Sequence, residues 1–252
     1  MTVHTQIRGG VLVVTIDRPE VKNAIDTATA QAIADAMDLL DTTDDLTAGV
    51  LTGAGETFCT GMDLKAFLAG ERPSIEGRGF AGIAQTPPAK PVIAAVEGHA
   101  IAGGFEIVLA CDLVVASETA VFGLPEVKRG LLAGGGGLLR LPERVPYALG
   151  LEWALTGDFV SAEQAGDAGL INRLTPKGGA LDAAIELAER IAANGPLAVR
   201  GTKSIWTAAR DWGNDERFAK MWEIYEPIRS SDDAREGATA FREKRAPVWK
   251  GR

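Results

Sequence analysis

Two glutamates occupy apolar stretches in which an ionised carboxylate is costly. Glu106 lies near the start of an apolar helical pattern (GGFEIVLA), and Glu126 follows a proline at the end of another apolar segment (VFGLPEVKRG). A charge in such a setting destabilises a protein unless it is paired or functional. The structural alternatives are stabilisation of the helix dipole for Glu106 and a surface turn for Glu126.

Two glycine-containing turns could present main-chain N–H groups to a ligand. Residues 57–64 (TFCTGMDL) connect a short strand to a helix that begins near Asp63, and residues 97–106 (EGHAIAGGFE) connect a strand to a helix that opens at Gly103. The first N–H groups of a helix lack internal partners. Where two such groups converge on one oxygen they form an oxyanion hole, which polarises a thioester carbonyl and stabilises an enolate. Each turn alone is weak support, because most glycine-rich turns only reverse the chain.

The motifs of several other chemistries are missing. The sequence contains no GxxxxGK[ST] phosphate loop and no GxSxG nucleophile elbow. The glycine run 134–137 lacks the strand-to-helix context of a dinucleotide fingerprint. The histidines are His4 and His99 alone, and the two cysteines, Cys59 and Cys111, lie far apart. We therefore expect no metal site and no disulfide, and a cytoplasmic protein with reduced thiols.

Composition limits the class of protein further. The chain has 252 residues, of which 46% are hydrophobic and 24% charged, so it can build one large domain with a full core. Its formal net charge of −8 disfavours nucleic acid as a partner. The first residues do not resemble a signal peptide, and no apolar stretch is long enough to span a membrane. We expect neither nucleic acid nor a membrane as a partner.

The elements that must position the two turns alternate between strands and helices. Strand patterns lie at Val11–Ile16, 50–52, Val92–Val96 and 113–116, and helical patterns begin at Thr27 and Gly103. This order predicts an α/β fold made of repeated ββα-like turns. Residues 71–81 (ERPSIEGRGFA) mix proline, glycine and charges, and we interpret them as a mobile loop and a candidate lid.

Beyond Gly130 the pattern is mainly helical. The run AGGGG at 133–137 is interpreted as a loop, and helices are expected at 146–155, 162–168, 180–193, 196–210, 215–228 and 232–244. The last helices carry or flank four of the five tryptophans, Trp206, Trp212, Trp222 and Trp249. Such a tail either covers a partner surface or packs on its own core.

Taken together, the motifs resemble the enoyl-CoA hydratase (crotonase) superfamily over essentially the whole chain. The resemblance is carried by RPEVKNAID (18–26), TGAGETFCTGMDL (52–64), KPVIAAVEGHAIAGGFEIVLACDLVVAS (90–117), FGLPEVKRGL (122–131) and GGGGLLRLP (134–142), in that order. The final block, EGATAFREKRAPVWKGR (236–252), is similar to that of the carnitinyl-CoA dehydratase type.

The resemblance implies a crotonase-like spiral of ββα turns over residues 1–195, which binds and converts acyl-CoA. Residues 196–252 are then a C-terminal helical trimerisation region, and the protein is a homotrimer or a hexamer. The implied activity is that of a hydro-lyase, an enoyl-CoA hydratase that adds water across the 2,3 double bond of a 2-enoyl-CoA. Coenzyme A is part of the substrate, and no further cofactor is implied.

Alternatives within the resemblance remain open. They are another crotonase-type enzyme, similar to carnitinyl-CoA dehydratase or to Δ3,Δ2-enoyl-CoA isomerase, and a non-catalytic acyl-CoA-binding protein. Both catalytic glutamate positions of the hydratases are filled, by Glu106 and Glu126, which favours addition or elimination of water.

Residue roles follow by motif position. Met62 and Gly103 would supply the oxyanion N–H groups, although many hydratases carry the smaller alanine at the position of Met62. The implied coenzyme A contacts are Val21, Lys22, Thr60 and Asp63. Lys22, Lys65 and Arg18 are candidates to balance the negative charge of the cofactor moiety.

Overall fold

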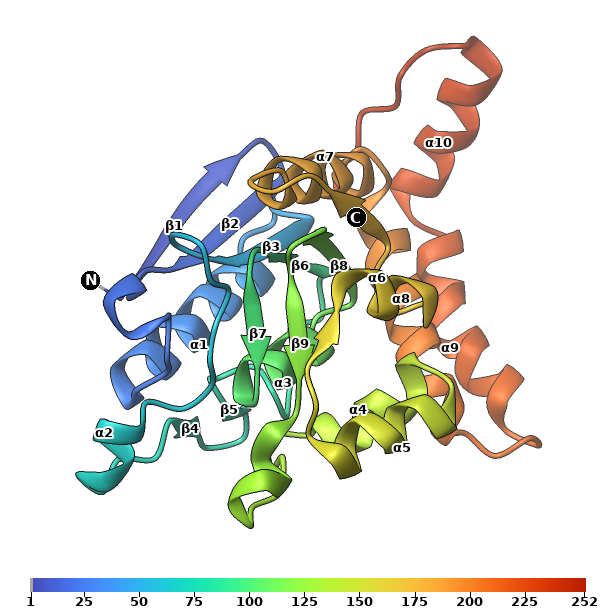
Figure 1. Ribbon diagram of the computed structural model, residues 1–252. Coiled ribbons are helices and arrows are strands. Elements are labelled where there is room, and N and C mark those ends of the chain that lie inside the picture. The colour runs from blue at the N-terminus through green and yellow to red at the C-terminus, as the bar shows by residue number, and fades with distance from the viewer. Residues whose placement is uncertain (1) are drawn as a thin grey trace.

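A six-stranded sheet forms the centre of the protein. In the computed structural model, which describes residues 2–252, its order is β1-β2-β3-β6-β8-β11 (Figure 1). β1 and β2 pair antiparallel, and the other neighbours are parallel. The strands are Val3–Arg8, Val11–Ile16, Ala48–Gly53, Val92–Val96, Leu113–Ser117 and Arg173–Thr175, in the order of the sheet.

A second, smaller sheet runs beside the first and gives the fold its spiral. It has the order β10-β9-β7, formed by Val160–Ser161, Val121–Gly123 and His99–Ile101. The chain passes from β6 to β7 and helix α3 (Gly103–Ala110), and then from β8 to β9, so successive turns stack in one order. Cys59, which follows β3, extends this second layer by pairing parallel with Ala100 of β7. The predicted spiral of ββα turns is confirmed.

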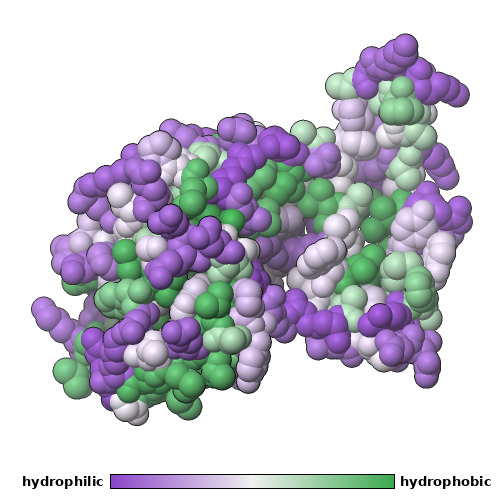
Figure 2. Space-filling view, turned by 45° about the vertical axis from the view of Figure 1, so that its right-hand side comes forward, coloured by the Kyte–Doolittle hydropathy of each residue, from purple (hydrophilic) through white to green (hydrophobic). Residues whose placement is uncertain are grey.

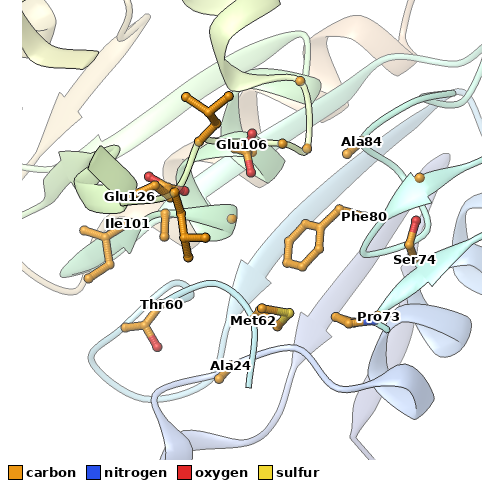
Figure 3. A pocket seen from close by; sticks show the side chains of 18 of the residues that line it. Ala24, Thr60, Met62, Pro73, Ser74, Phe80, Ala84, Ile101, Glu106 and Glu126 are labelled. Carbon is orange, nitrogen blue, oxygen red and sulfur yellow. The ribbon is translucent and has the colours of Figure 1, made fainter. Parts of the chain in front are cut away.

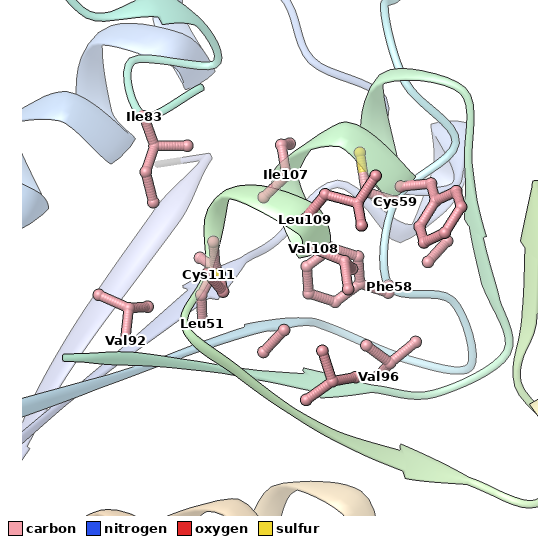
Figure 4. Packing of buried hydrophobic residues seen from close by; sticks show 14 of the residues in the cluster. Leu51, Phe58, Cys59, Ile83, Val92, Val96, Ile107, Val108, Leu109 and Cys111 are labelled. Atoms are coloured by element: carbon pink, nitrogen blue, oxygen red, sulfur yellow. The ribbon is translucent and has the colours of Figure 1, made fainter. Parts of the chain in front are cut away.

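Hydrophobic side chains alternate between two cores because β2 and its neighbours are covered on both faces. Leu12 and Val14 face one core with helices α1 (Thr27–Thr42) and α3, as the packing in Figure 4 illustrates for α3. Val11 and Val13 face the other core, which α7 (Ala180–Ala192) closes. This burial on both faces explains the nearly continuous apolar runs of these strands.

The remaining helices form the second half of the chain. They are α4 (Gly137–Arg144), α5 (Tyr147–Thr156), α6 (Ala162–Asp167), α8 (Pro196–Ala208), α9 (Arg217–Arg229) and α10 (Asp232–Glu243). Short helices α2 (Leu64–Leu68), η1 (Pro19–Val21), η2 (Pro125–Arg129) and η3 (Ala209–Asp211) lie between longer elements. No helix within residues 2–252 is both long and apolar enough to cross a membrane.

Helices α8 to α10 lie to one side of the sheet in Figure 1. Lys203 of α8 joins them to the core, because its Nζ donates to the carboxylate of Asp112 at 2.6 Å and to the carbonyl of Lys90 at 3.0 Å. Asp112 also accepts from the N–H of Val92 at 2.8 Å. The division of the chain at residues 195 and 196 stays a prediction.

Two segments that the sequence analysis interpreted as loops contain or adjoin regular structure. The expected loop 133–137 ends at Gly137, which is the first residue of α4. The sequence analysis did not predict this helix, because a run of four glycines leads into it and Pro142 lies inside it. Residues 71–81 contain a small antiparallel hairpin, β4 (Ser74–Ile75) and β5 (Gly79–Phe80), and are not wholly irregular. The mobility expected of this segment stays a prediction.

Candidate active site

Parallel pairing brings the two glycine-containing turns together. Cys59 donates its N–H to the carbonyl of His99 at 3.0 Å, and Ile101 donates to the carbonyl of Cys59 at 3.1 Å. Gly61 and Gly103 follow these bonds, and a Cβ built on Gly61 would lie 2.9 Å from the main-chain nitrogen of Gly103. The backbones are therefore closer than two side-chain-bearing residues permit, which is the physical reason for glycine at this point.

Both implied oxyanion N–H groups are free in this arrangement. The neighbours of Met62 are occupied, because Gly61 accepts from the N–H of Ile25 at 2.8 Å and Asp63 donates to the carbonyl of Ile25 at 2.9 Å. Within residues 2–252, the N–H groups of Met62 and Gly103 have no hydrogen-bond acceptor. Gly103 is the first residue of α3, where the N–H points out of the helix. Two free donors on adjacent turns can bind one oxygen.

Glu106 is fixed beside these donors in a site that disfavours its charge. Its side chain is buried, with 4% of the residue exposed, and its Oε1 accepts from the N–H of Gly137 at 2.9 Å. Burial raises the pKa of Glu106 to about 6, against the lowering effect of the Gly137 N–H, and the nearby Glu126 adds to the rise. Near neutral pH such a carboxyl can exchange a proton with substrate or water.

Glu126 enters the same space from η2, where Pro125 at the first helical position sets its direction. Burial raises its pKa, and Arg129 opposes that rise. Its Oε2 is buried without a hydrogen-bond partner in residues 2–252. A buried, unpaired carboxyl oxygen is costly, and a bound substrate or water would supply the missing partner.

Near the first turn, a polar network holds the loop that contains Lys22. Thr60 donates its N–H to the carbonyl of Lys22 at 3.2 Å, and Asp63 caps α2 by accepting from the N–H of Lys65 at 3.0 Å. Burial opposes the ionisation of Asp63, but the Ala66 N–H and the guanidinium of Arg18 outweigh it and lower the pKa.

Arg18 itself is not available to a ligand. Its guanidinium lies 3.0 Å from the carboxylate of Asp63 and 3.1 Å from that of Asp26, and it does not line the cavity. These two ion pairs argue against the hypothesis that Arg18 balances the charge of coenzyme A, which stays a prediction. Lys22 and Lys65 do line the cavity.

One cavity of about 1320 Å³ brings the candidate residues together (Figure 3). Its lining contains all eight residues implied by the resemblance, Val21, Lys22, Thr60, Met62, Asp63, Gly103, Glu106 and Glu126. Glu106 and Glu126 lie on one side of the cavity, and Thr60, Met62 and Ala24 lie on the opposite side. Their common position agrees with the implied roles, which stay predictions.

Sequence reasoning missed two features of the site. The glycine run was interpreted as a loop, but Gly137 of that run donates its N–H to the carboxylate of Glu106. Phe80, in the segment interpreted as a loop, projects into the cavity. An aromatic residue amid polar and glycine residues was the available signal for Phe80. No group of three or more His, Cys, Asp or Glu side chains in residues 2–252 is arranged to hold a metal ion.

Known proteins share both the sequence and the fold. The profile of the enoyl-CoA hydratase/isomerase family matches residues 6–252. Carnitinyl-CoA dehydratase of Proteus mirabilis is 40% identical over 100% of this chain and 99% of its own. The crystal structures of enoyl-CoA hydratases from Mycobacterium marinum and Mycobacterium tuberculosis are 58% and 55% identical, each with a TM-score of 0.98 over 100% of this chain and 99% of theirs.

Fold and site therefore define a protein of the crotonase type. The chain belongs to the enoyl-CoA hydratase/isomerase family.

Proposed function

We propose that the protein is a hydratase that adds water reversibly across the 2,3 double bond of a 2-enoyl-CoA thioester. As a crotonase-type member of its family it is a hydro-lyase that acts on acyl-CoA. The observation that carries the finer proposal is the meeting in one cavity of two free N–H groups, the buried Glu106 and the half-buried Glu126, whose Oε2 is buried without a partner.

Substrate activation begins at the thioester carbonyl. Its oxygen accepts hydrogen bonds from the N–H groups of Met62 and Gly103, which withdraws electrons from C3 and prepares it for attack by water. The same bonds stabilise the enolate that forms when oxygen adds to C3. Because these donors are main-chain groups held by neighbouring hydrogen bonds, they need no reorganisation during the reaction.

The two glutamates then divide the proton transfers. Glu106, held by Gly137, orients a water molecule and takes its proton as the hydroxyl oxygen bonds to C3. Glu126 supplies the proton that C2 receives as the enolate collapses. The water thus delivers hydroxyl to C3, and the proton that Glu106 gains replaces the one that Glu126 loses. The raised pKa values of both carboxyls suit one protonated and one ionised partner.

Coenzyme A enters as part of the substrate and not as a separate cofactor. We assign its contacts to Val21, Lys22, Thr60 and Asp63, with Lys65 available for a phosphate. Electrophilic activation and both proton transfers are supplied by the protein itself, so the proposed reaction calls on no further cofactor.

Dehydration of a carnitinyl-type acyl-CoA is the second candidate. The full-length 40% identity to a carnitinyl-CoA dehydratase favours it, and the same two carboxyls serve addition and elimination of water. An isomerase needs only one acid–base group, so the presence of both Glu106 and Glu126 favours a hydratase. A non-catalytic acyl-CoA-binding protein has no use for a buried, unpaired carboxyl.

We further propose a homotrimer, or a hexamer made of two trimers, in the cytoplasm. The support is the exposed aromatic surface of the C-terminal helices, to which Trp206 and Trp222 contribute. Reduced thiols agree with the location, because Cys59 and Cys111 are both buried and free.

A turnover panel tests the function. Crotonyl-, longer-chain, branched, aromatic and carnitinyl-type CoA thioesters and a 3-enoyl-CoA are each incubated with the enzyme. Loss or gain of the enoyl-thioester absorbance is followed, and the products are identified. We expect 3-hydroxyacyl-CoA from at least one 2-enoyl-CoA. Conversion of a 3-enoyl-CoA to a 2-enoyl-CoA without hydration would support the isomerase, and binding without turnover would support the binder.

A further inference from the structure

We propose that Phe80 is the residue that limits the size of the group carried on C3 of the substrate. Its ring lies against the oxyanion turn at Gly103, and its Cβ lies near Gly135 beside Glu106, so the side chain borders the space in which the reacting carbons of a bound acyl group must lie. The inference rests on the proposed hydratase function, and the binding measurement below separates the two.

The position of the ring follows from its contacts with two glycines. A Cβ built on Gly103 would lie 2.5 and 2.6 Å from Cε1 and Cζ of Phe80. A Cβ built on Gly135 would lie 3.3 Å from Cβ of Phe80 and 2.8 Å from Oε2 of Glu106. The side chain therefore reaches from the glutamate to the oxyanion turn. Figure 3 shows it projecting into the cavity between Met62 and Glu106.

The backbone around Phe80 holds the ring in this place. Gly79, Ala81 and Gly82 have φ values of +74°, +55° and +69°, so the chain turns sharply on both sides of the residue. Ala81 donates its N–H to the carbonyl of Pro73 at 2.9 Å, and Ala84 donates to the carbonyl of Phe80 at 3.1 Å.

Helix α1 supports this turn from behind. A Cβ on Gly82 would lie 2.5 Å from the carbonyl oxygen of Ala30, so the turn packs directly on the helix backbone. Arg78 forms an ion pair with Asp38 of the same helix. These contacts make Phe80 a fixed wall of the cavity, whatever the mobility of the hairpin tip.

The chemistry of the substrate explains why this wall selects at C3. The carbonyl carbon is tied to the oxyanion donors, and C3, two bonds away, must approach the water held by Glu106. A substituent on C3 then lies beside the ring of Phe80, which borders the space between the oxyanion donors and Glu106. Pocket contacts of this kind discriminate by about 10- to 200-fold for a single methylene group. A straight, short chain fits past the ring more readily than an aryl group.

The test compares crotonyl-CoA with cinnamoyl-CoA, which differ only in a methyl or phenyl group on C3. The ratio of kcat/KM for cinnamoyl-CoA to that for crotonyl-CoA is expected to rise at least about tenfold in Phe80→Ala. Phe80→Leu should give an intermediate rise and guards against misfolding of the smaller variant. Phe67→Ala, which removes the same ring from α2 outside the cavity lining, should leave the ratio unchanged.

Binding of the saturated analogues gives a readout that needs no turnover. Calorimetry with butyryl-CoA and 3-phenylpropionyl-CoA should show the phenyl ligand gaining affinity relative to butyryl in Phe80→Ala by a similar factor. If this change appears but the wild type hydrates no enoyl-CoA, the hydratase proposal fails and the role of Phe80 stands. If folded Phe80→Ala and Phe80→Leu keep the wild-type ratios in both measurements, Phe80 does not set selectivity.

Discussion

The carboxyl groups of the two glutamates differ in their hydrogen bonds. Glu106 is pinned by the N–H of Gly137, which fixes the direction in which its free oxygen points. Glu126 leaves one buried oxygen without a protein partner, so its surroundings are complete only when something binds. A fixed carboxylate suits the orientation of water, and an unpaired carboxyl suits proton delivery to a bound carbon. This asymmetry is the physical basis for the division of roles proposed above.

Glutamine substitutions test that division. Glu126→Gln keeps the shape but removes the exchangeable proton, so kcat for hydration should fall by about a hundred- to ten-thousand-fold, with KM changed far less. Glu106→Gln should behave similarly, and the double variant should be little worse than the poorer single variant because both groups act on one addition. Circular dichroism and coenzyme A affinity control for folding. Near-normal hydration by both single variants would refute the two-glutamate mechanism.

Stability should respond to pH at Glu106. Its pKa is about 6 in the folded protein against an ordinary value of 4.5, so the folded state holds more protons between these pH values. Stability from this group is therefore present below pH 4.5 and is lost as the pH rises through 6. At about 1.4 kcal/mol for each pKa unit, the loss is about 2 kcal/mol.

The matching variant is Glu106→Gln, which does not ionise and can still accept from Gly137. We compare the free energy of unfolding of the variant with that of the wild type at each pH. The variant's advantage should be about 2 kcal/mol larger at pH 8 than at pH 4. Urea unfolding at both pH values and at one protein concentration measures this. A stability difference that is the same at pH 4 and pH 8 would show that Glu106 does not titrate with a raised pKa.

At the scale of elements, the proposed mechanism depends on the start of α3. Ala102, the residue before it, has φ +51° and ψ −130°, an uncommon conformation for a residue with a Cβ. Its N–H donates to the carbonyl of Gly123 at 2.9 Å, which ties the turn to β9. Strain of this kind persists where the surrounding structure holds it, often at functional sites. Here it accompanies the free N–H of Gly103.

Substitution of Gly103 by proline or by alanine distinguishes the loss of the N–H donor from the steric effect of an added side chain. Both place a Cβ against Phe80, but only Gly103→Pro removes the donor. Because proline is tolerated at the first position of a helix, α3 should still form. We expect kcat of Gly103→Pro to fall a further hundred- to thousand-fold below that of Gly103→Ala. Equal rates for the two variants would mean that this N–H does not stabilise the transition state.

Some elements of the fold can be predicted from the sequence, whereas others depend on tertiary contacts. Strands such as Val11–Ile16 and the helix at Gly103–Ala110 are predicted well. They are buried on all sides, so their sequences are nearly continuous apolar runs. Helix α4 is missed because glycines needed against Glu106 suppress the helical signal locally. Phe80 is missed for a related reason, since its position depends on packing against α1, which no local pattern records. The pairing of Arg18 with Asp63, 45 residues away in the sequence, likewise depends on the tertiary structure.

For the whole molecule, the exposed aromatic side chains of the C-terminal helices are the feature that bears on assembly. Trp249 packs on its own chain, with its indole N–H donating to the carbonyl of Ala193 at 2.8 Å. Trp206 and Trp222 are instead 79% and 50% exposed, and Phe218 and Tyr225 on α9 are exposed beside Trp222. Figure 2 shows hydrophobic surface on both sides of the hollow between the body and these helices. Such a gathering of exposed large aromatics is typical of an interface and supports the proposed assembly.

We therefore expect assembly to depend on this surface and not on hydrophobic exposure in general. Light scattering of the wild type should give a mass of three or six times 26.4 kDa. Trp206→Glu buries a charge if the interface forms there, so it should shift the population toward smaller species at micromolar concentration. Ile7→Glu, which changes an exposed side chain of β1 at the opposite end of the chain, should leave the mass unchanged. A stable wild-type monomer would exclude the trimer, and equal effects of the two variants would move the interface away from α8.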